Sequence, residues 1–181
     1  MNAKLEDALN NVETTYGELV EIANTMLKPL FEPINNLVGV INSTVNALSI
    51  EQIRDYILQL QLKAFEIAET KEKAALKAEL AEALQKEKIA VSFNRLDGSA
   101  AVKDKLALVE ASSETVAETL YNLVANLLKT KLDQLHRLVD ALKSILMSRM
   151  QETKFMNIGS NAEIPATVGQ TYQYNGTPTK F

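Results

Sequence analysis

Apolar residues recur at alternating steps of four and three along the first 48 residues of the chain. That spacing places them on one face of an α-helix that packs along its length on another helix. Pro29 and Pro33 lie inside the pattern, and a proline removes a backbone donor and clashes with the preceding turn. The pattern therefore predicts two helices, roughly 3–27 and 30–47, that meet at a kink or break. The predicted seam is Leu5, Leu9, Val12, Tyr16, Leu19, Ala23, Met26, Leu30, Ile34, Leu37, Ile41, Val45 and Leu48.

A second helix is predicted to begin at about residue 50. Ser49 is a favourable N-cap residue, and Gln52 three positions later completes a capping box. The change from large to small residues along its apolar seam would let a partner helix approach closely in the second half. The seam consists of Ile53, Ile57, Leu60, Ala64, Ile67, Ala74, Ala78 and Ala81.

The stretch SFNRLDGSAAVKDK, residues 92–105, separates this helix from a third one. Asp97-Gly98 is a strong turn signal, and Ser99 can cap the helix that follows. That last helix is predicted over roughly 100–151, so that residues 50–151 form an antiparallel hairpin. Its apolar seam is Leu128, Leu132, Leu135, Val139, Leu142 and Leu146.

The composition changes from about Lys154, where Gly, Thr, Asn and Pro replace the helical pattern. An extended or disordered tail is predicted for 154–181. Tyr172, Tyr174 and Phe181 would be available to a partner, although an unanchored terminus is the simpler interpretation. The predicted organisation is an amphipathic helical arm over 1–48, a long helical hairpin over 49–153 and this tail.

The composition agrees with an all-α fold. The 181 residues include six Gly, four Pro, no Trp and 6% aromatics. The abundant Ala, Leu, Glu and Lys favour long helices, because straight-chain residues lose little rotamer freedom in a helix.

The sequence shows no targeting or membrane segment. The N-terminus carries acids where a signal peptide needs an apolar run. The most apolar window, INNLVGVINSTVNAL, is too short and Asn-rich to span a bilayer. We therefore expect no membrane partner and a cytoplasmic or virion location.

The side chains argue against catalysis and against a cofactor. The chain has no Cys, which excludes thiolate metal sites and a Cys nucleophile. His136 is the only histidine, so the pair of Glu-x-x-His motifs that a ferritin-like metal site needs is absent, although Asp133 lies one turn away. Gly98 stands alone rather than in a phosphate-binding loop, and no nucleophile-elbow sequence is present. We expect no enzyme activity, no metal and no cofactor.

The net charge of −4 is unevenly distributed. Residues 1–50 account for an excess of four acids, whereas cations gather around the predicted turn and in the late helix. An aromatic ring among cations suits single-stranded nucleic acid, because cations contact phosphates and a ring stacks on a base. The simpler interpretation, that the ring packs under the turn and the lysines solvate it, is favoured by composition alone. The candidate nucleic-acid-binding residues are Lys88, Phe93, Arg95, Lys103 and Lys105.

Three segments between roughly residues 53 and 152 carry a resemblance. They are KEKAALKAELAEALQKEK, then RLDGSAAVKDKLALVEAS, then LYNLVANLLKTKLDQLHRLVDALKSILMSRMQE. Together they resemble a set of small helical phage proteins that includes the recombination mediator of T-even phages. The resemblance implies ring-forming oligomers that bind single-stranded DNA and help load a recombinase. It assigns DNA contact to Arg95, Lys103 and Lys105, and assembly to the Leu seams of the long helices. The acidic arm and the Thr/Asn/Gly tail depart from that pattern.

Two functions are therefore expected from the sequence. The first is a non-enzymatic helical homo-oligomer that binds single-stranded DNA and assists phage recombination or replication in the infected cell, with a recombinase or other phage proteins as partners. The alternative is a structural or scaffolding protein, such as a virion component, that assembles through its helical seams and its C-terminal tail. The acidic first 50 residues and the aromatic tail favour the alternative.

Overall fold

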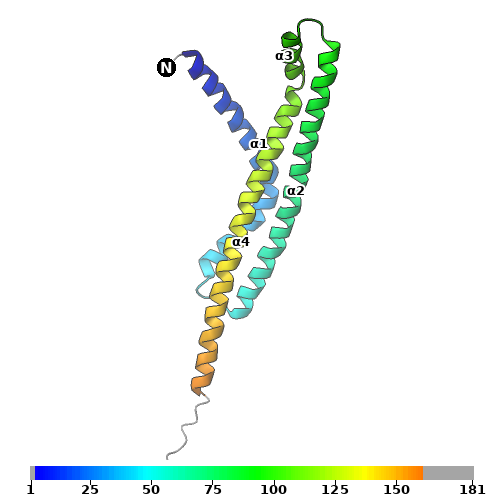
Figure 1. The fold of residues 1–181 in the computed structure, drawn as a ribbon. Helices are drawn as coiled ribbons and strands as arrows, with labels where there is room; N and C mark the ends of the chain where they lie inside the picture. The colour runs from blue at the N-terminus through cyan, green and yellow to red at the C-terminus, as the bar shows by residue number, and fades with distance from the viewer. Residues whose placement is uncertain (1–2, 161–181) are drawn as a thin grey trace, which may run out of the picture.

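The computed structural model describes the backbone over residues 3–160 and the side chains over 12–155. Within these residues the fold consists of four helices without strands, which confirms the all-α prediction (Figure 1). They are α1 (Ala3–Thr44), α2 (Ile50–Arg95), α3 (Ala100–Glu110) and α4 (Ser112–Ser160). The helices α2 and α4 run side by side in opposite directions and form a long hairpin, which confirms the predicted architecture.

The core of the hairpin follows the predicted seams. Ile53, Leu60 and Ile67 on α2 are completely buried, and Ala74, Ala78 and Ala81 continue the buried line toward the turn. Ile57 is half-buried and packs against the same cluster. Apolar burial along this interface is the main favourable term for the fold.

The helix α1 runs without a break through Pro29 and Pro33, so the predicted division into two helices is wrong, whereas the predicted alternative of a kink does not require a break. It curves along its length, which is how a helix accommodates a missing donor and a bulky ring (Figure 1). Ile34 and Ile41 are buried beyond the prolines, and Ala23 and Leu27 are buried before them. Tertiary packing on both sides therefore keeps the helix continuous where local chemistry favours a break.

The first half of α1 diverges from α4 toward its N-terminus (Figure 1). Val12, Tyr16 and Met26 were predicted in the seam, but they are exposed. The second half of α1 and the turn that follows it are held against α4 by polar contacts as well as by the core. The Lys131 amine donates to the Asn35 amide oxygen, and Arg149 Nη2 donates to the carbonyl oxygens of Val45 (2.9 Å) and Asn46 (3.0 Å).

The ends of α2 agree with the sequence patterns. The Ser49 hydroxyl accepts a hydrogen bond from the backbone N–H of Gln52 at 3.2 Å, and the Gln52 side-chain oxygen accepts one from the backbone N–H of Ser49 at 2.8 Å. This pair confirms the capping box. At the other end Gly98 has φ +124°, a conformation that an L-residue rarely adopts. Ser99 is the N-cap of α3, as predicted, although its hydroxyl makes no capping hydrogen bond.

The predicted single helix over 100–151 is wrong in two respects. It is divided at Ala111, whose φ of −90° and ψ of 10° end α3 before α4 begins. Ala107 and Ala111 are completely buried, so the division lies against the rest of the hairpin rather than in solvent. In addition, α4 continues to Ser160, past the predicted start of the tail at Lys154. Residues 161–181, including the three tail aromatics, lie outside the described residues.

Across the part of the chain that the structure describes, the helices are too polar for any of them to cross a membrane.

Candidate functional site at the hairpin tip

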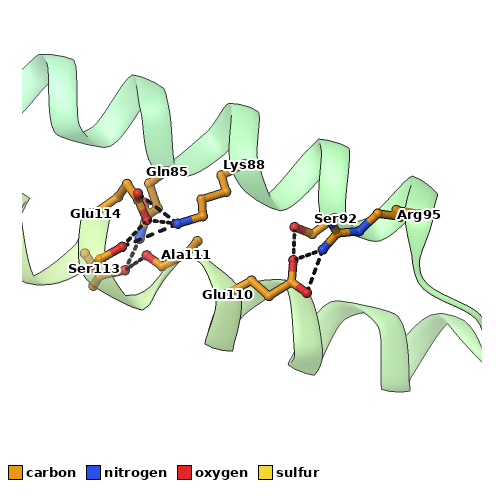
Figure 2. A network of polar contacts seen from close by, with 9 residues as sticks. Gln85, Lys88, Ser92, Arg95, Glu110, Ala111, Ser113 and Glu114 are labelled. Atoms are coloured by element: carbon orange, nitrogen blue, oxygen red, sulfur yellow. Dashed lines mark hydrogen bonds and ion pairs between the residues drawn. The ribbon is translucent and has the colours of Figure 1, made fainter.

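The tip of the hairpin brings the end of α2 against α3 and the first turn of α4. The Leu96 amide donates to the Ser92 carbonyl oxygen at 2.9 Å and closes the last turn of α2. After Gly98 the chain reverses, so that α3 packs back on α2. Side chains from α2 and from the α3–α4 junction therefore face one another (Figure 2).

Glu110, at the end of α3, accepts from two side chains of α2. The Ser92 hydroxyl, which is buried, donates to Glu110 Oε2. Arg95 Nη2 lies 2.9 Å from Glu110 Oε1 and 2.8 Å from Oε2 (Figure 2). The hydrogen bond from Ser92, and then the Arg95 charge, hold the pKa of the Glu110 carboxyl below its usual value. The carboxylate thus ties the end of α3 to the last turn of α2.

A second carboxylate, Glu114 in the first turn of α4, pairs with a cation of α2 in the same way. Lys88 Nζ lies 2.9 Å from both oxygens of Glu114, and the Ser113 hydroxyl donates to Glu114 Oε2 at 2.8 Å (Figure 2). These hydrogen bonds, with that from Lys88 the largest influence, lower the pKa of the Glu114 carboxyl. Beside it, Gln85 Nε2 donates to the Thr115 hydroxyl at 2.6 Å. The two carboxylates and their donors are called the tip network below.

The structure places the five candidate nucleic-acid-binding residues at one end of the molecule. Some of them are engaged in contacts within the chain and are less available to a ligand. Lys88 and Arg95 form the ion pairs of the tip network. Phe93 is half-buried, and Lys103 Nζ lies 5.7 Å from the centre of its ring in a cation–π contact. Lys105 is exposed and makes none of the polar contacts found among the described residues. Two of the four cations are therefore neutralised within the chain.

The acidic partners in the tip network were not recognised from the sequence. In the sequence, Glu110 and Glu114 are spaced with Glu118 along one face of a helix, with no sign of a pairing across the turn. A hairpin that is symmetric about Gly98 would place Arg95 and Lys88 opposite residues 101 and 108, whereas Glu110 and Glu114 lie 12 and 16 residues after Gly98. Those two positions are Ala101 and Leu108, so the turn signal alone does not identify the acidic partners of Lys88 and Arg95.

The six residues of the α4 seam, predicted to mediate oligomerisation, lie inside a single chain. Leu128, Leu135, Val139 and Leu142 are buried in the core shared with α1 and α2. Leu132 and Leu146 are half-buried and pack against the same core. A second copy could use this seam only if the hairpin opened, so any assembly of folded chains needs another surface.

His136 lies in an open groove between α2 and α4. Phe65 and Ala64 line the groove from α2, and Leu132 and Asp140 line it from α4. Over the described residues, no three His, Cys, Asp or Glu side chains gather in a way that could hold a metal ion.

Comparison with known proteins adds no family to this geometry: no family model, no curated protein and no solved structure matches the chain.

Proposed function

We propose that this chain is a non-enzymatic structural or scaffolding protein that acts by assembling with further copies of itself. The observation that carries the proposal is the amount of apolar surface that the folded chain leaves exposed. On α2 alone, seven large apolar side chains are at least 48% exposed: Leu58, Leu62, Phe65, Leu76, Leu80, Leu84 and Val91.

Exposed apolar residues are normal when they are scattered singly, whereas apolar residues that gather on one face mark interaction surfaces. Here α2 carries an apolar seam on its buried side and, on its exposed side, a second row made of two apolar blocks, residues 58–65 and 76–91. Among the described residues, the second row contributes none of the core of one chain, and covering it would remove apolar surface from water.

The test of this proposal is the mass of the full chain in solution. We expect sedimentation velocity over a concentration series to show reversible association at physiological salt. A chain that stays monomeric at every concentration would contradict the proposal.

Binding of single-stranded DNA at the tip is a second candidate, and one observation favours it. Lys105 makes no polar contact with the described residues, and Lys103 lies over the face of the half-exposed Phe93, so a ring and two cations remain on the surface outside the tip network. Few contacts per chain would be sufficient if an assembly presented many tips to one strand.

Fluorescence anisotropy of a labelled single-stranded oligonucleotide tests this candidate, with a duplex of the same sequence as control. We expect Lys103→Glu/Lys105→Glu to abolish salt-dependent binding while Arg95 keeps its ion pair with Glu110. The matched control is Lys129→Glu/Lys154→Glu, which makes the same charge change at exposed positions of α4. No binding at low salt, or equal loss in both variants, would exclude a site at the tip.

A further inference from the structure

Six of the seven exposed residues on α2, all except Val91 nearer to the tip, form a row that we call the outer stripe. It consists of Leu58, Leu62, Phe65, Leu76, Leu80 and Leu84. These residues follow the helical repeat about two positions out of step with the buried seam Leu60, Ala64 and Ile67. Two positions correspond to about 200° around a helix, so the outer stripe lies opposite the core. Phe65 is its most exposed member, at 74%.

The outer stripe is symmetric about the level of residue 71. Leu58 and Leu84 each lie thirteen residues from that level, and Leu62 and Leu80 each lie nine. Phe65 and Leu76 lie six and five residues from it. Between the two apolar blocks the same face carries Glu69 and Lys73, each two residues from the centre and of opposite charge.

From this symmetry we propose that two copies of the chain pair through the outer stripe, with their α2 helices antiparallel and a twofold axis at residue 71. This deepens the proposed function, on which it rests, by naming the partner and the surface. A twofold contact requires a self-complementary face. In this register Leu58 faces Leu84 of the second copy, and Leu62 faces Leu80 of the second copy.

The charges at the centre fit the same register. Glu69 faces Lys73 of the second copy, and the twofold axis repeats that pair on the other side. In the single chain Lys73 Nζ lies 2.6 Å from Glu69 Oε1, and both side chains are about two-thirds exposed, so they are available to a second copy. Glu72, which also lies near the axis, is paired with Lys71 of its own chain at 2.9 Å.

The size of the contact is sufficient for a specific but reversible dimer. Residues 58–84 span about 40 Å of helix. Six large side chains per copy, with the stems of the charged residues beside them, would bury roughly 1,000 Å² in total, which is at the lower end for specific interfaces. We therefore expect a dimer that dissociates on dilution.

The first experiment compares two leucines of equal exposure in the full-length chain. Leu62 and Leu108 are both 55% exposed, but Leu62 belongs to the outer stripe and Leu108 lies on α3. We expect Leu62→Lys to weaken association by about tenfold or more, because it places a charge in an apolar contact. Leu108→Lys should associate like the unmodified chain. Circular dichroism should show the same helix content for both variants.

The second experiment tests direction and register. The chain has no cysteine, so a single one can be introduced without interference. A mixture of the Leu58→Cys and Leu84→Cys variants should form a crosslinked dimer with a short bis-maleimide. Neither variant should crosslink with itself, because the two copies of residue 58 would lie about 40 Å apart in the antiparallel register.

A third variant is expected to strengthen the dimer. In the proposed register Asp55 faces Glu87 of the second copy, and both are exposed. Asp55→Lys should therefore tighten association, because it replaces two repulsive contacts by attractive ones. Asp133→Lys on α4 changes the net charge equally and should have no such effect.

The outcomes separate the inference from the proposed function. A monomeric unmodified chain would overturn both. Association that Leu62→Lys leaves unchanged would overturn the inference and leave assembly through another surface. Crosslinking of Leu58→Cys with itself would show a parallel pair and overturn the antiparallel register.

Discussion

At the scale of single residues, Gly98 determines how the hairpin turns. Its φ of +124° is a backbone conformation that residues with a Cβ rarely adopt. Space is not the obstacle, because a Cβ at this position would lie 3.6 Å from Val102, an ordinary contact distance. The cost of a substitution therefore lies in the backbone. We expect Gly98→Ala to lower the free energy of unfolding by about 1–3 kcal/mol in denaturant unfolding.

Gly39 provides a control, because the same substitution there should change the free energy of unfolding in the opposite direction. It lies inside α1, and a Cβ there would have no neighbour within 4 Å. Gly39→Ala should raise the free energy of unfolding by about 0.5–1 kcal/mol, because alanine loses less backbone entropy in a helix. A loss of stability in both variants would contradict the account given for Gly98.

The lowered pKa of Glu110 predicts how the stability of the tip depends on pH. A carboxyl whose pKa is lower in the folded chain stabilises it above the unfolded value, about 4.3 for glutamate, and this contribution disappears as the pH falls through the folded value. Thermal unfolding followed by circular dichroism between neutral and acidic pH should show this loss.

Glu110→Gln removes the titrating group and should flatten that pH dependence. Glu79→Gln, at an exposed position of α2, should leave it unchanged. Equal slopes in the unmodified chain and in Glu110→Gln would contradict a role for this carboxylate.

The sequence predicts such residue-level features when their cause is local. The capping box at Ser49 and the turn at Gly98 depend on neighbouring residues, and both were predicted. The pairing of Lys88 with Glu114 depends on how two helices align after the chain reverses. The sequence alone gives no partner for Lys88 or Arg95. Their acidic partners become visible only when the alignment of the two arms of the hairpin is known.

At the scale of the helices, the small residues in the second half of α2 determine what can pack there. Ala74, Ala78 and Ala81 are buried, in contrast to the Ile and Leu residues nearer to the start of the helix. We expect Ala78→Leu to cost about 1–3 kcal/mol of stability, because extra methylenes would force the neighbouring helix away.

Ala141 on α4 is exposed and provides the control for this substitution. Ala141→Leu should change the free energy of unfolding by less than about 0.5 kcal/mol. Both values are measurable by chemical denaturation. A tolerated leucine at Ala78 would indicate that the tip half of the hairpin is loosely packed.

Helix boundaries were predictable where the chain itself supplies a stop. Ser49 and Gly98 mark the start of α2 and the turn after it. By contrast, Pro29 indicates a break in α1 that packing of Leu27 and Ile34 overrides. The division at Ala111 has no proline or glycine to announce it, although Ser112 and Ser113, which favour helix ends over helix interiors, follow it directly.

At the scale of the whole molecule, α1 and the hairpin share one core. Ile34 of α1 is completely buried in the same cluster as Leu60 of α2 and Leu128 of α4. We expect Ile34→Ala to cost about 2–5 kcal/mol. Val40→Ala, at a position that is 48% exposed, should cost far less.

Hydrogen exchange in the Ile34→Ala variant would show how far this coupling extends. If α1 and the hairpin unfold as one unit, amides of both should lose protection together. Loss of protection confined to α1 would show that the hairpin is stable without it.

The sequence separations of the polar contacts imply an order in which the molecule folds. Arg95 and Glu110 are 15 residues apart in the chain, whereas Lys131 and Asn35 are 96 apart, and Arg149 and Val45 are 104 apart. Short loops close at a smaller entropic cost than long ones. Folding should therefore nucleate at the tip, proceed along the hairpin toward its open end, and finish when α1 docks on a surface that α4 has by then completed.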